Sequence, residues 1–450
     1  MEEKFDNIVA NLIEMFESGD SSKIGSVIES MRAPDLADVL SALPEEVWIF
    51  VFRELDTETA SGVLSIVDEG VARDILEDLH ADEIVPLIEI MASDDATDII
   101  NLLPDEKVPS VLQRISREDY EDVSELLKFD KETAGGLMAR ELLTVNGGMK
   151  ISDVIAVIRN EAENIENIQN IYVVDSAEVL LGSIPVINLL VSDSDNRADE
   201  IMEKGILTVT VDTDQEEVAA IFSKYDLYAL PVVDERGRLK GRITADDIMD
   251  VIEEEANEDI TMMAGTGEEE FWERSSFKLS RARLPWLLTG LLGGIASAFV
   301  MNNFKASLES VLTLSFFVPV ITAMAGNAGI QSSAIVVREL AVGGISFGQT
   351  SSKLVRELKV SLINGLILAS ILMTIILLWQ GDFKLGVLLG LCMFFIICWA
   401  TVMGAMIPLL LKRGNIDPAL ATGPFITTSN DILGILIYLG TATLFIDWLR

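Results

Sequence analysis

Residues 319–333 read PVITAMAGNAGIQSS, and residues 423–431 read GPFITTSND. Both stretches lie within long apolar runs, yet both are rich in Gly, Pro and side chains with hydroxyl, amide or carboxylate groups. Such residues cost free energy inside a bilayer unless they face protein or water. The two stretches therefore predict a membrane domain with a polar pathway through it.

The C-terminal part holds five apolar runs of the length that spans a membrane, about 20 residues each. They cover about 284–302, 311–337, 360–379, 385–411 and 419–446. Lys and Arg in short flanks favour the cytoplasmic side, and nine of them lie on one side against three on the other. The nine are Lys278, Arg281, Arg283, Arg338, Lys353, Arg356, Lys359, Lys412 and Arg413, and the three are Lys305, Lys384 and Arg450. We expect a multi-pass cell (plasma) membrane protein with a cytoplasmic N-terminus and an external C-terminus.

Negative charge is concentrated before the apolar runs. The 450 residues include 72 Asp+Glu and 33 Lys+Arg, for a formal charge of −39, and residues 284–450 carry seven acids against nine bases. This acidity argues against binding nucleic acid, because phosphates are repelled. One His and two Cys argue against His-dependent catalysis and a disulfide framework. Phosphate-loop motifs are absent from the sequence as well, and we do not expect an enzyme.

Within an expected N-terminal domain at 1–130, residues 20–130 show a repeat of helix-start signals about every 12 residues. Each signal is a Pro, Ser, Asp or Ala followed by acids, which suits a helix N-terminus. They begin at Pro44, Asp56, Asp68, Ala81, Ser93, Pro104 and Ser116. Short amphipathic helices at this spacing predict an all-α superhelical domain with an acidic surface.

Residues 131–260 change to β-branched runs in two copies. Ile171–Asp175 and Leu230–Asp234 are each followed by a second short strand and preceded by a strand and a helix. This β-α-β-β-α pattern resembles a tandem pair of CBS domains. The second copy is the better match, because it ends in GRITADD (241–247), whereas the first ends in GSIPVIN (182–188).

The CBS resemblance bears on nucleotide binding. CBS pairs commonly hold adenine nucleotides, and Thr244 and Asp247 match the residues near the ribose. The first copy has Pro185 and Asn188 at the corresponding places. We therefore expect ATP binding to be weak or absent.

The domain order and the two membrane motifs together resemble the MgtE family of magnesium channels, over essentially the whole chain. The resemblance implies a homodimer in which cytoplasmic domains gate a Mg²⁺-selective pore with five helices per subunit. It also implies a linker (plug) helix at 261–283, before the transmembrane domain at 284–450. The expected fold is thus a multidomain membrane protein with an α-helical repeat domain, an α/β CBS pair and a five-helix membrane domain.

Asp431 is the one carboxylate well inside an apolar run. Mg²⁺ takes oxygen ligands, keeps several waters and uses one or two carboxylates. Hydroxyls and freed carbonyls near a helix-opening Pro are suited to hold those waters. The candidate pore residues are Asp431, Thr427, Thr428, Gly423 and Asn327.

A second acidic group follows the CBS pair. Asp247, Asp250 and Glu254, continued by Glu258, share one helix face, which is also the pattern of an ordinary solvated face. The resemblance instead implies cytosolic Mg²⁺ binding there, with Gly136 as a backbone ligand. The candidate sensor residues are Asp226, Asp247, Asp250, Glu254, Glu255, Glu258, Asp259, Asp417 and Gly136.

The sequence thus predicts a Mg²⁺ channel that moves ions passively and closes when its acidic domains bind Mg²⁺. Two alternatives stay open. One is a nucleotide-sensing receptor with a CBS pair and a membrane domain that does not conduct. The other is a secondary divalent-cation exchanger that uses the same residues.

Overall fold

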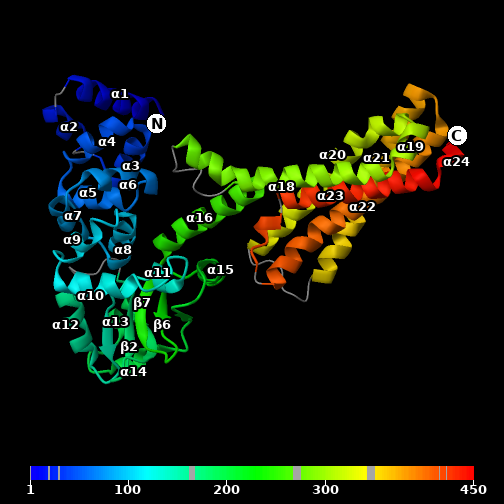
Figure 1. Ribbon diagram of the computed structural model, residues 1–450. Coiled ribbons are helices and arrows are strands. Elements are labelled where there is room, and N and C mark those ends of the chain that lie inside the picture. The colour runs from blue at the N-terminus through cyan, green and yellow to red at the C-terminus, as the bar shows by residue number, and fades with distance from the viewer. Residues whose placement is uncertain are drawn as a thin grey trace. The chain divides into compact units, whose positions relative to one another are not determined.

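The computed structural model describes residues 2–18, 21–28, 31–161, 168–266, 275–341, 350–414, 416–421 and 423–449. The chain divides into two compact units, Met1–Glu253 and Glu254–Arg450. The first unit contains the helical repeats and the CBS pair, and the second contains the membrane helices. Each unit is described by itself (Figure 1).

In the described part of the chain, ten helices build the N-terminal repeats. They are α1 (Glu2–Ser18), α2 (Ser21–Ile28), α3 (Ala33–Ala42), α4 (Glu45–Phe52), α5 (Thr57–Leu64), α6 (Glu69–Asp78), α7 (Ala81–Ile88), α8 (Ser93–Leu102), α9 (Val108–Leu112) and α10 (Arg117–Leu126). From α3 to α8, each helix packs against the helix two further along the chain. This stacking confirms the predicted superhelix and can be followed in Figure 1.

Local sequence explains why the helices begin where they do. The Asp56 carboxylate accepts the Thr59 N–H at 3.0 Å, and the Ser116 hydroxyl accepts the Asp119 N–H at 3.2 Å. Both are N-cap bonds that satisfy an otherwise free helix donor. Pro104 differs from the prediction: its carbonyl closes a turn, and α9 begins only after Lys107. The Lys107 ammonium donates to the carbonyls of residues 76, 77 and 79 at the end of α6.

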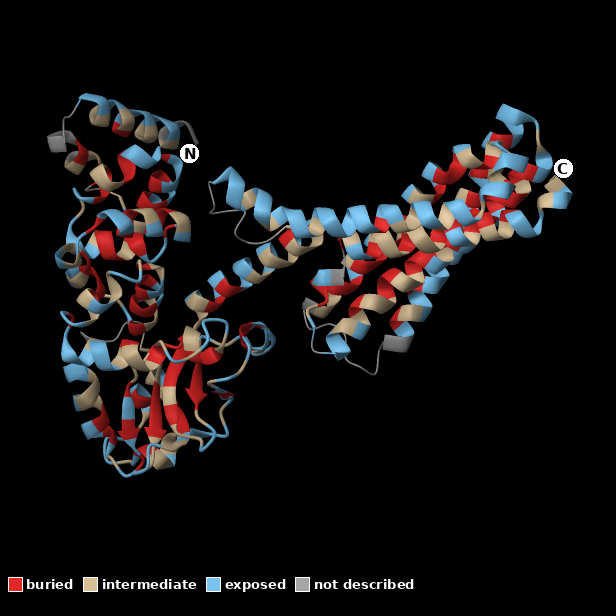
Figure 2. Ribbon diagram, in the orientation of Figure 1, coloured by how far each residue is buried: buried red, intermediate tan, exposed pale blue. Residues whose placement is uncertain are grey.

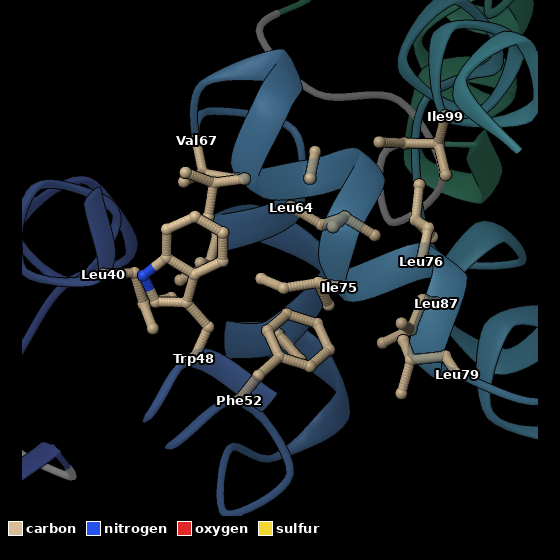
Figure 3. Close-up of a cluster of buried hydrophobic side chains, with 14 of the residues drawn as sticks. Leu40, Trp48, Phe52, Leu64, Val67, Ile75, Leu76, Leu79, Leu87 and Ile99 are labelled. Atoms are coloured by element: carbon tan, nitrogen blue, oxygen red, sulfur yellow. The ribbon is translucent and has the colours of Figure 1, made fainter. Parts of the chain in front are cut away.

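Apolar side chains from successive helices fill the interior of the repeats. Trp48 and Phe52 of α4 meet Leu64 of α5 and Ile75 of α6 (Figure 3). Trp48 is buried, and its indole N–H donates to the Leu43 carbonyl at 2.9 Å. The buried stripe of each helix therefore becomes one continuous core only when the helices stack.

The CBS part has two small sheets. The first has β1 (Thr144–Asn146), β2 (Asn170–Val174), β3 (Leu180–Pro185) and β4 (Glu203–Lys204), and the second has β5 (Val209–Thr210), β6 (Ala229–Val233) and β7 (Leu239–Thr244). The helices are α11 (Ala134–Leu137), α12 (Ile151–Glu161), α13 (Val186–Val191), α14 (Ala198–Ile201), α15 (Gln215–Tyr225) and α16 (Ala245–Ala264).

Strand pairing repeats in the two sheets. The β1–β2 and β5–β6 pairs are parallel, joined through α12 and α15, while β2–β3 and β6–β7 are antiparallel. A parallel pair needs such a crossover, whereas an antiparallel pair needs only a tight turn. The predicted β-α-β-β-α repeat is confirmed, and the first copy has β4 in addition.

The second unit has five helices of membrane-spanning length and composition among the residues described, as predicted. They are α18 (Ser276–Asn303), α20 (Thr313–Ala341), α21 (Thr350–Gln380), α22 (Phe383–Arg413) and α23 (Pro424–Leu444), with the short elements α19 (Lys305–Ser310), η2 (Ala419–Ala421) and α24 (Ile446–Leu449) between or after them. Helix α22 is the most enclosed, with α20, α21 and α23 packed on it (Figure 2).

The stretch expected to form a separate linker helix, 261–283, is divided differently. Helix α16 continues to Ala264 and ends where Gly265 adopts a left-handed φ of +76°, a conformation that suits Gly at a helix C-terminus. Helix α18 starts at Ser276 and runs on through the first membrane span. Residues 267–274 lie outside the described part of the chain.

Candidate ion pathway and acidic sensor

Asp431 lies on α23, two turns after the helix begins at Pro424. It is the only charged residue in the sequence of this helix, and its side chain is half-buried. An ionised carboxylate at membrane depth is expensive and marks an ion or substrate pathway by default. Asp431 is therefore the candidate centre of an ion pathway.

Three helices cross in close contact beside Asp431. A Cβ built on Gly329 of α20 would lie 2.0 Å from the Nδ2 atom of Asn430 on α23. A Cβ built on Gly404 of α22 would lie 2.3 Å from the Gly329 carbonyl oxygen. Asn430 is 2 % exposed, and its Nδ2 atom has no hydrogen-bond partner among the described residues. We call these three residues the helix crossing; it admits no larger side chain at 329 or 404.

The two threonines of the pore motif face different helices. Thr428 packs against α18, where a Cβ on Gly293 would lie 2.1 Å from its methyl group. The Thr427 methyl lies 3.7 Å from a Cβ built on Gly326 of α20, and its hydroxyl donates to the Pro424 carbonyl at 3.0 Å. Thr427 shares the face of Asp431, four residues on, whereas Thr428 is a packing contact. Asn327 is exposed in the single chain.

Gly423 lies where the end of α16 meets the start of α23. A Cβ at Gly423 would be 3.3 Å from the Met263 carbonyl oxygen and 3.6 Å from that of Met262. A Cβ built on Gly265 would in turn lie 3.3 Å from the Cδ atom of Pro424. The last carbonyls of α16 thus approach the residues that open α23, and Gly423 permits this approach.

The candidate sensor residues gather partly at one place in the first unit. Helices α8 and α16 bring their N-terminal turns together, so that Asp94 and Asp95 interact electrostatically with Asp247. Burial, and then the charges of Asp247 and its neighbours, raise the pKa of Asp95 to about 6. We call the group the acidic joint: Asp94, Asp95, Asp246, Asp247 and Asp250.

The pKa values of Asp94, Asp247 and Asp250 are raised as well. Burial is the largest cause that raises the pKa of Asp94 well above its ordinary value, followed by the charge of Asp247. Burial and then Asp247 also raise the pKa of Asp250. Carboxylates that repel one another in this way favour protons or cations between them. The donor set is all oxygen, which fits Mg²⁺.

The remaining sensor candidates lie elsewhere. In the first unit, Asp226 ends α15 in the left-handed conformation (φ 52°), and Gly136 belongs to α11, where a Cβ would lie 2.5 Å from the Asp130 carbonyl oxygen. In the second unit, Asp417 accepts the Ala419 N–H at 2.8 Å. Glu254, Glu255, Glu258 and Asp259 lie on the part of α16 assigned to that unit. Within the described residues, no three acids, His or Cys converge on a ready metal site.

Asp94 and Asp95 were not among the residues expected from the sequence. The sequence analysis places them in the helix-start signal at Ser93. The structure confirms this signal, because α8 begins at Ser93. The N–H and hydroxyl of Ser93 donate to the Glu141 carboxylate at 3.1 and 2.9 Å, so a CBS-side residue supplies the cap. The sequence does contain a signal for them. Asp94 and Asp95 are two consecutive acids at the start of α8, and neither is needed to cap the helix.

The candidate nucleotide residues are close together. The Thr244 N–H and hydroxyl both donate to one oxygen of Asp247, at 3.0 and 2.6 Å. Asp247 therefore belongs to this Thr–Asp pair and to the acidic joint at once. We therefore expect a ligand at one of these places to change the electrostatics of the other.

The acidic joint predicts how stability depends on pH in metal-free buffer. Because the pKa of folded Asp95 is about 6, above the ordinary value of about 3.8, the folded state holds this proton more tightly than the unfolded state. The contribution of this proton to the free energy of unfolding is therefore fully present below about pH 4 and is lost as the pH rises to about 6. We expect the full chain, in detergent with a chelator, to melt a few degrees higher near pH 5 than near pH 7.5.

The matched control is Asp95→Asn, which keeps the shape of the side chain and removes its charge. We expect this variant to show a smaller difference between the two pH values in a thermal scan. If the melting temperatures of the variant at the two pH values differ as much as those of the unchanged protein, the pH dependence comes from the general acidity of the chain.

Comparison with known families agrees with this geometry. Residues 318–441 match a model described as MgtE, divalent cation transporter, and residues 31–132 match the MgtE intracellular N domain. Residues 198–254 match the CBS domain and correspond to the second copy. The first of these ranges contains the helix crossing and Asp431.

Individual relatives cover most of the chain. The magnesium transporter MgtE of Thermus thermophilus is 37% identical over 322 residues, which cover 71% of each chain. That of Enterococcus faecalis is 35% identical over 322 residues, which cover 72% of this chain and 71% of the relative. The solved cytosolic domain of the Mg²⁺ channel MgtE in complex with ATP is 32% identical with a TM-score of 0.51, and covers 54% of this chain and 99% of that one. The chain therefore belongs to the MgtE family of divalent cation transporters.

Proposed function

We propose that this protein is a Mg²⁺-selective channel for magnesium uptake, and that Mg²⁺ binding to its acidic cytoplasmic part closes it. Membership of the family supports Mg²⁺ transport as the activity. The observation that carries the pore is Asp431, the sole charged residue of α23, half-buried beside a crossing of three helices. Mg²⁺ is the substrate here, and we assign the protein no enzymatic reaction.

Mg²⁺ selectivity follows from charge and hydration at Asp431. Two copies of the carboxylate around one hydrated divalent ion balance its charge, whereas a monovalent ion would leave net negative charge at membrane depth. Mg²⁺ gives up water reluctantly, so contacts through its hydration shell set the size discrimination. Thr427 and Asn327 provide further oxygen groups, while Thr428 packs against Gly293 of α18 and Gly423 permits the close approach of α16.

Gating rests on the acidic joint and on α16. Like charges at the joint repel in the absence of cations, and divalent ions between them reverse the sign of that interaction. Helix α16 carries Asp247 and Asp250 near its start, and its last carbonyls lie on Gly423 at the entrance of α23. Mg²⁺ held by the sensor residues would fix α16 in the position that keeps the pore closed. Asp226, Glu254, Glu255, Glu258, Asp259, Asp417 and Gly136 are the further ligands that we propose for this state.

We further propose a homodimer in the cell membrane, with the N-terminus in the cytoplasm and the C-terminus outside. In the single chain, Ile187, Leu190 and Val191 expose large apolar surfaces on α13, a CBS helix. Such patches mark contact surfaces in soluble parts of proteins, and two-fold assemblies are the commonest. The excess of Lys and Arg on one side of the membrane spans supports the orientation.

ATP binding is a secondary proposal. A related cytosolic domain was solved with ATP, and here Thr244 and Asp247 form the pair expected at the ribose. Proline and asparagine in the first copy lack the corresponding groups. We propose weak ATP binding that shares Asp247 with the acidic joint.

Purified protein in liposomes tests the channel against the two alternatives. We expect Mg²⁺ influx down its gradient without nucleotide and without a counter-ion, reported by an entrapped Mg²⁺-sensitive dye. A requirement for an opposing cation gradient would identify an exchanger. Absence of flux from folded protein at low Mg²⁺ would leave the nucleotide-sensing receptor.

A further inference from the structure

Two charged side chains are buried near the N-terminal end of a membrane helix. Lys353 is 7 % exposed and Glu357 is 6 % exposed, and both lie at the start of the span Ser352–Gln380 on α21. Ionisable residues at such positions are rare and face protein or water. The ion pathway proposed above uses neither of them.

Their partners lie on α20. The Lys353 ammonium forms an ion pair with Glu339, and it lies 4.0 Å from the Glu357 carboxylate. The Ser332 hydroxyl donates to the other oxygen of Glu357 at 2.9 Å, and Ser332 itself is 2 % exposed. Two polar interactions therefore connect α20 with α21, while each helix also packs on α22. We call Ser332, Glu339, Lys353 and Glu357 the polar clamp.

A contribution to folding stability does not by itself explain why the polar clamp is buried here. A buried ion pair often contributes no more than well-packed apolar residues of the same volume, because removing two charges from water is costly. Its better-attested effect is to select one arrangement of helices over others. The question is then which arrangement this group selects.

The position of Ser332 on α20 indicates which helix arrangement the polar clamp selects. Ser332 lies three residues after Gly329, so both lie on the same side of the helix within one turn. Gly329 contacts Asn430, the residue next to Asp431. A rotation of α20 that broke the Ser332–Glu357 bond would also turn Gly329 away from Asn430.

We propose that the polar clamp fixes the rotation of α20 and thereby sets its spacing from α23 beside Asp431. Ser332, Lys353 and Glu357 are thus positioning residues for ion selection, although none of them touches the ion. This inference rests on the proposed role of Asp431 in the pore.

Three variants remove the clamp in steps without leaving a buried charge alone. Ser332→Ala removes one bond between the helices. The double variant Lys353→Met with Glu357→Gln removes both buried charges at nearly constant volume, and Glu339 is 35% exposed, so it can turn to water. The triple variant combines all three changes. The control is Lys305→Met with Glu309→Gln, an i,i+4 pair on α19 that is 71% and 68% exposed.

The measurement is Mg²⁺ and Ca²⁺ influx into liposomes, normalised to the folded protein found by size-exclusion chromatography. We expect Ser332→Ala to raise the half-saturating Mg²⁺ concentration about threefold, the equivalent of one interhelical hydrogen bond in a membrane. The double variant should raise it about tenfold, and the triple variant should lose most of its preference for Mg²⁺ over Ca²⁺. The control pair should change neither quantity.

Normal half-saturation and normal ion preference in the triple variant would overturn the proposal. If the triple variant does not fold, Ser332→Ala decides alone, and an unchanged half-saturation then rejects the clamp. Asp431→Ala, measured in parallel, separates the two hypotheses. Normal flux in that variant rejects the pore carboxylate, whereas a normal clamp variant beside an inactive Asp431→Ala rejects only the clamp.

Discussion

Asp431→Ala is expected to abolish Mg²⁺ flux into liposomes while the protein still folds and assembles. The cost of holding this carboxylate at membrane depth is about 2.5–3.5 kcal/mol, and on the proposed function a bound cation offsets it. Loss of that interaction corresponds to roughly a hundredfold or greater fall in transport. Asp431→Asn, which keeps the shape, should retain the fold and lose the preference for divalent over monovalent cations.

Asp447→Ala is the matched control, because it removes an exposed carboxylate on α24. Its flux should equal that of the unchanged protein. Normal Mg²⁺ currents through Asp431→Ala would contradict the assignment of the pore. Attention would then move to Asn327 and Gln331, which are exposed on α20 in the single chain.

The second large effect concerns closure. Neutralising Asp226, Asp247 and Asp250 to Asn should give a channel that continues to conduct when Mg²⁺ on the cytoplasmic side is high. The physical reason is that, in the proposed mechanism, Mg²⁺ stabilises the closed state by cancelling repulsion between carboxylates. Adding Asp95→Asn should strengthen the effect, because the charges of Asp247 and Asp250 both act on Asp95. Patch recordings with stepped cytoplasmic Mg²⁺ measure the closure directly.

A control with the same change in net charge separates the sensor from general acidity. Asp105→Asn, Glu106→Gln and Glu118→Gln remove three exposed acids of the helical repeats. This control should close at the same Mg²⁺ concentration as the unchanged protein. Normal closure in the Asp226, Asp247 and Asp250 variant would show that the sensor lies elsewhere.

The domain order could be predicted because each part has a local signal. Long apolar runs gave the five membrane helices, and paired β-branched runs gave the CBS repeats. Asp431 was identifiable for the same reason, since a single acid inside an apolar run stands out without knowledge of its neighbours. These signals depend on residues adjacent in the chain.

The remainder depends on contacts between distant residues. Asp95 and Asp247 are brought together only by the docking of α8 against the start of α16. The division of Thr427 and Thr428 between α20 and α18 likewise depends on which helices surround α23. The bounds of the described helices around the predicted linker also differ from the sequence expectation, because α16 continues to Ala264 and α18 begins at Ser276. The hydrophobic pattern of a single segment does not indicate which distant segments will contact it.

The helix crossing also constrains how homologous sequences can diverge. A methyl group at Gly329 would occupy the space of the Asn430 amide, and one at Gly404 would meet the Gly329 carbonyl. Gly329 can therefore gain volume only after Asn430 has lost some, whereas no substitution at 329 removes the carbonyl oxygen that a side chain at 404 would meet. We expect positions 329 and 430 to vary as a pair, with the smaller residue replaced second.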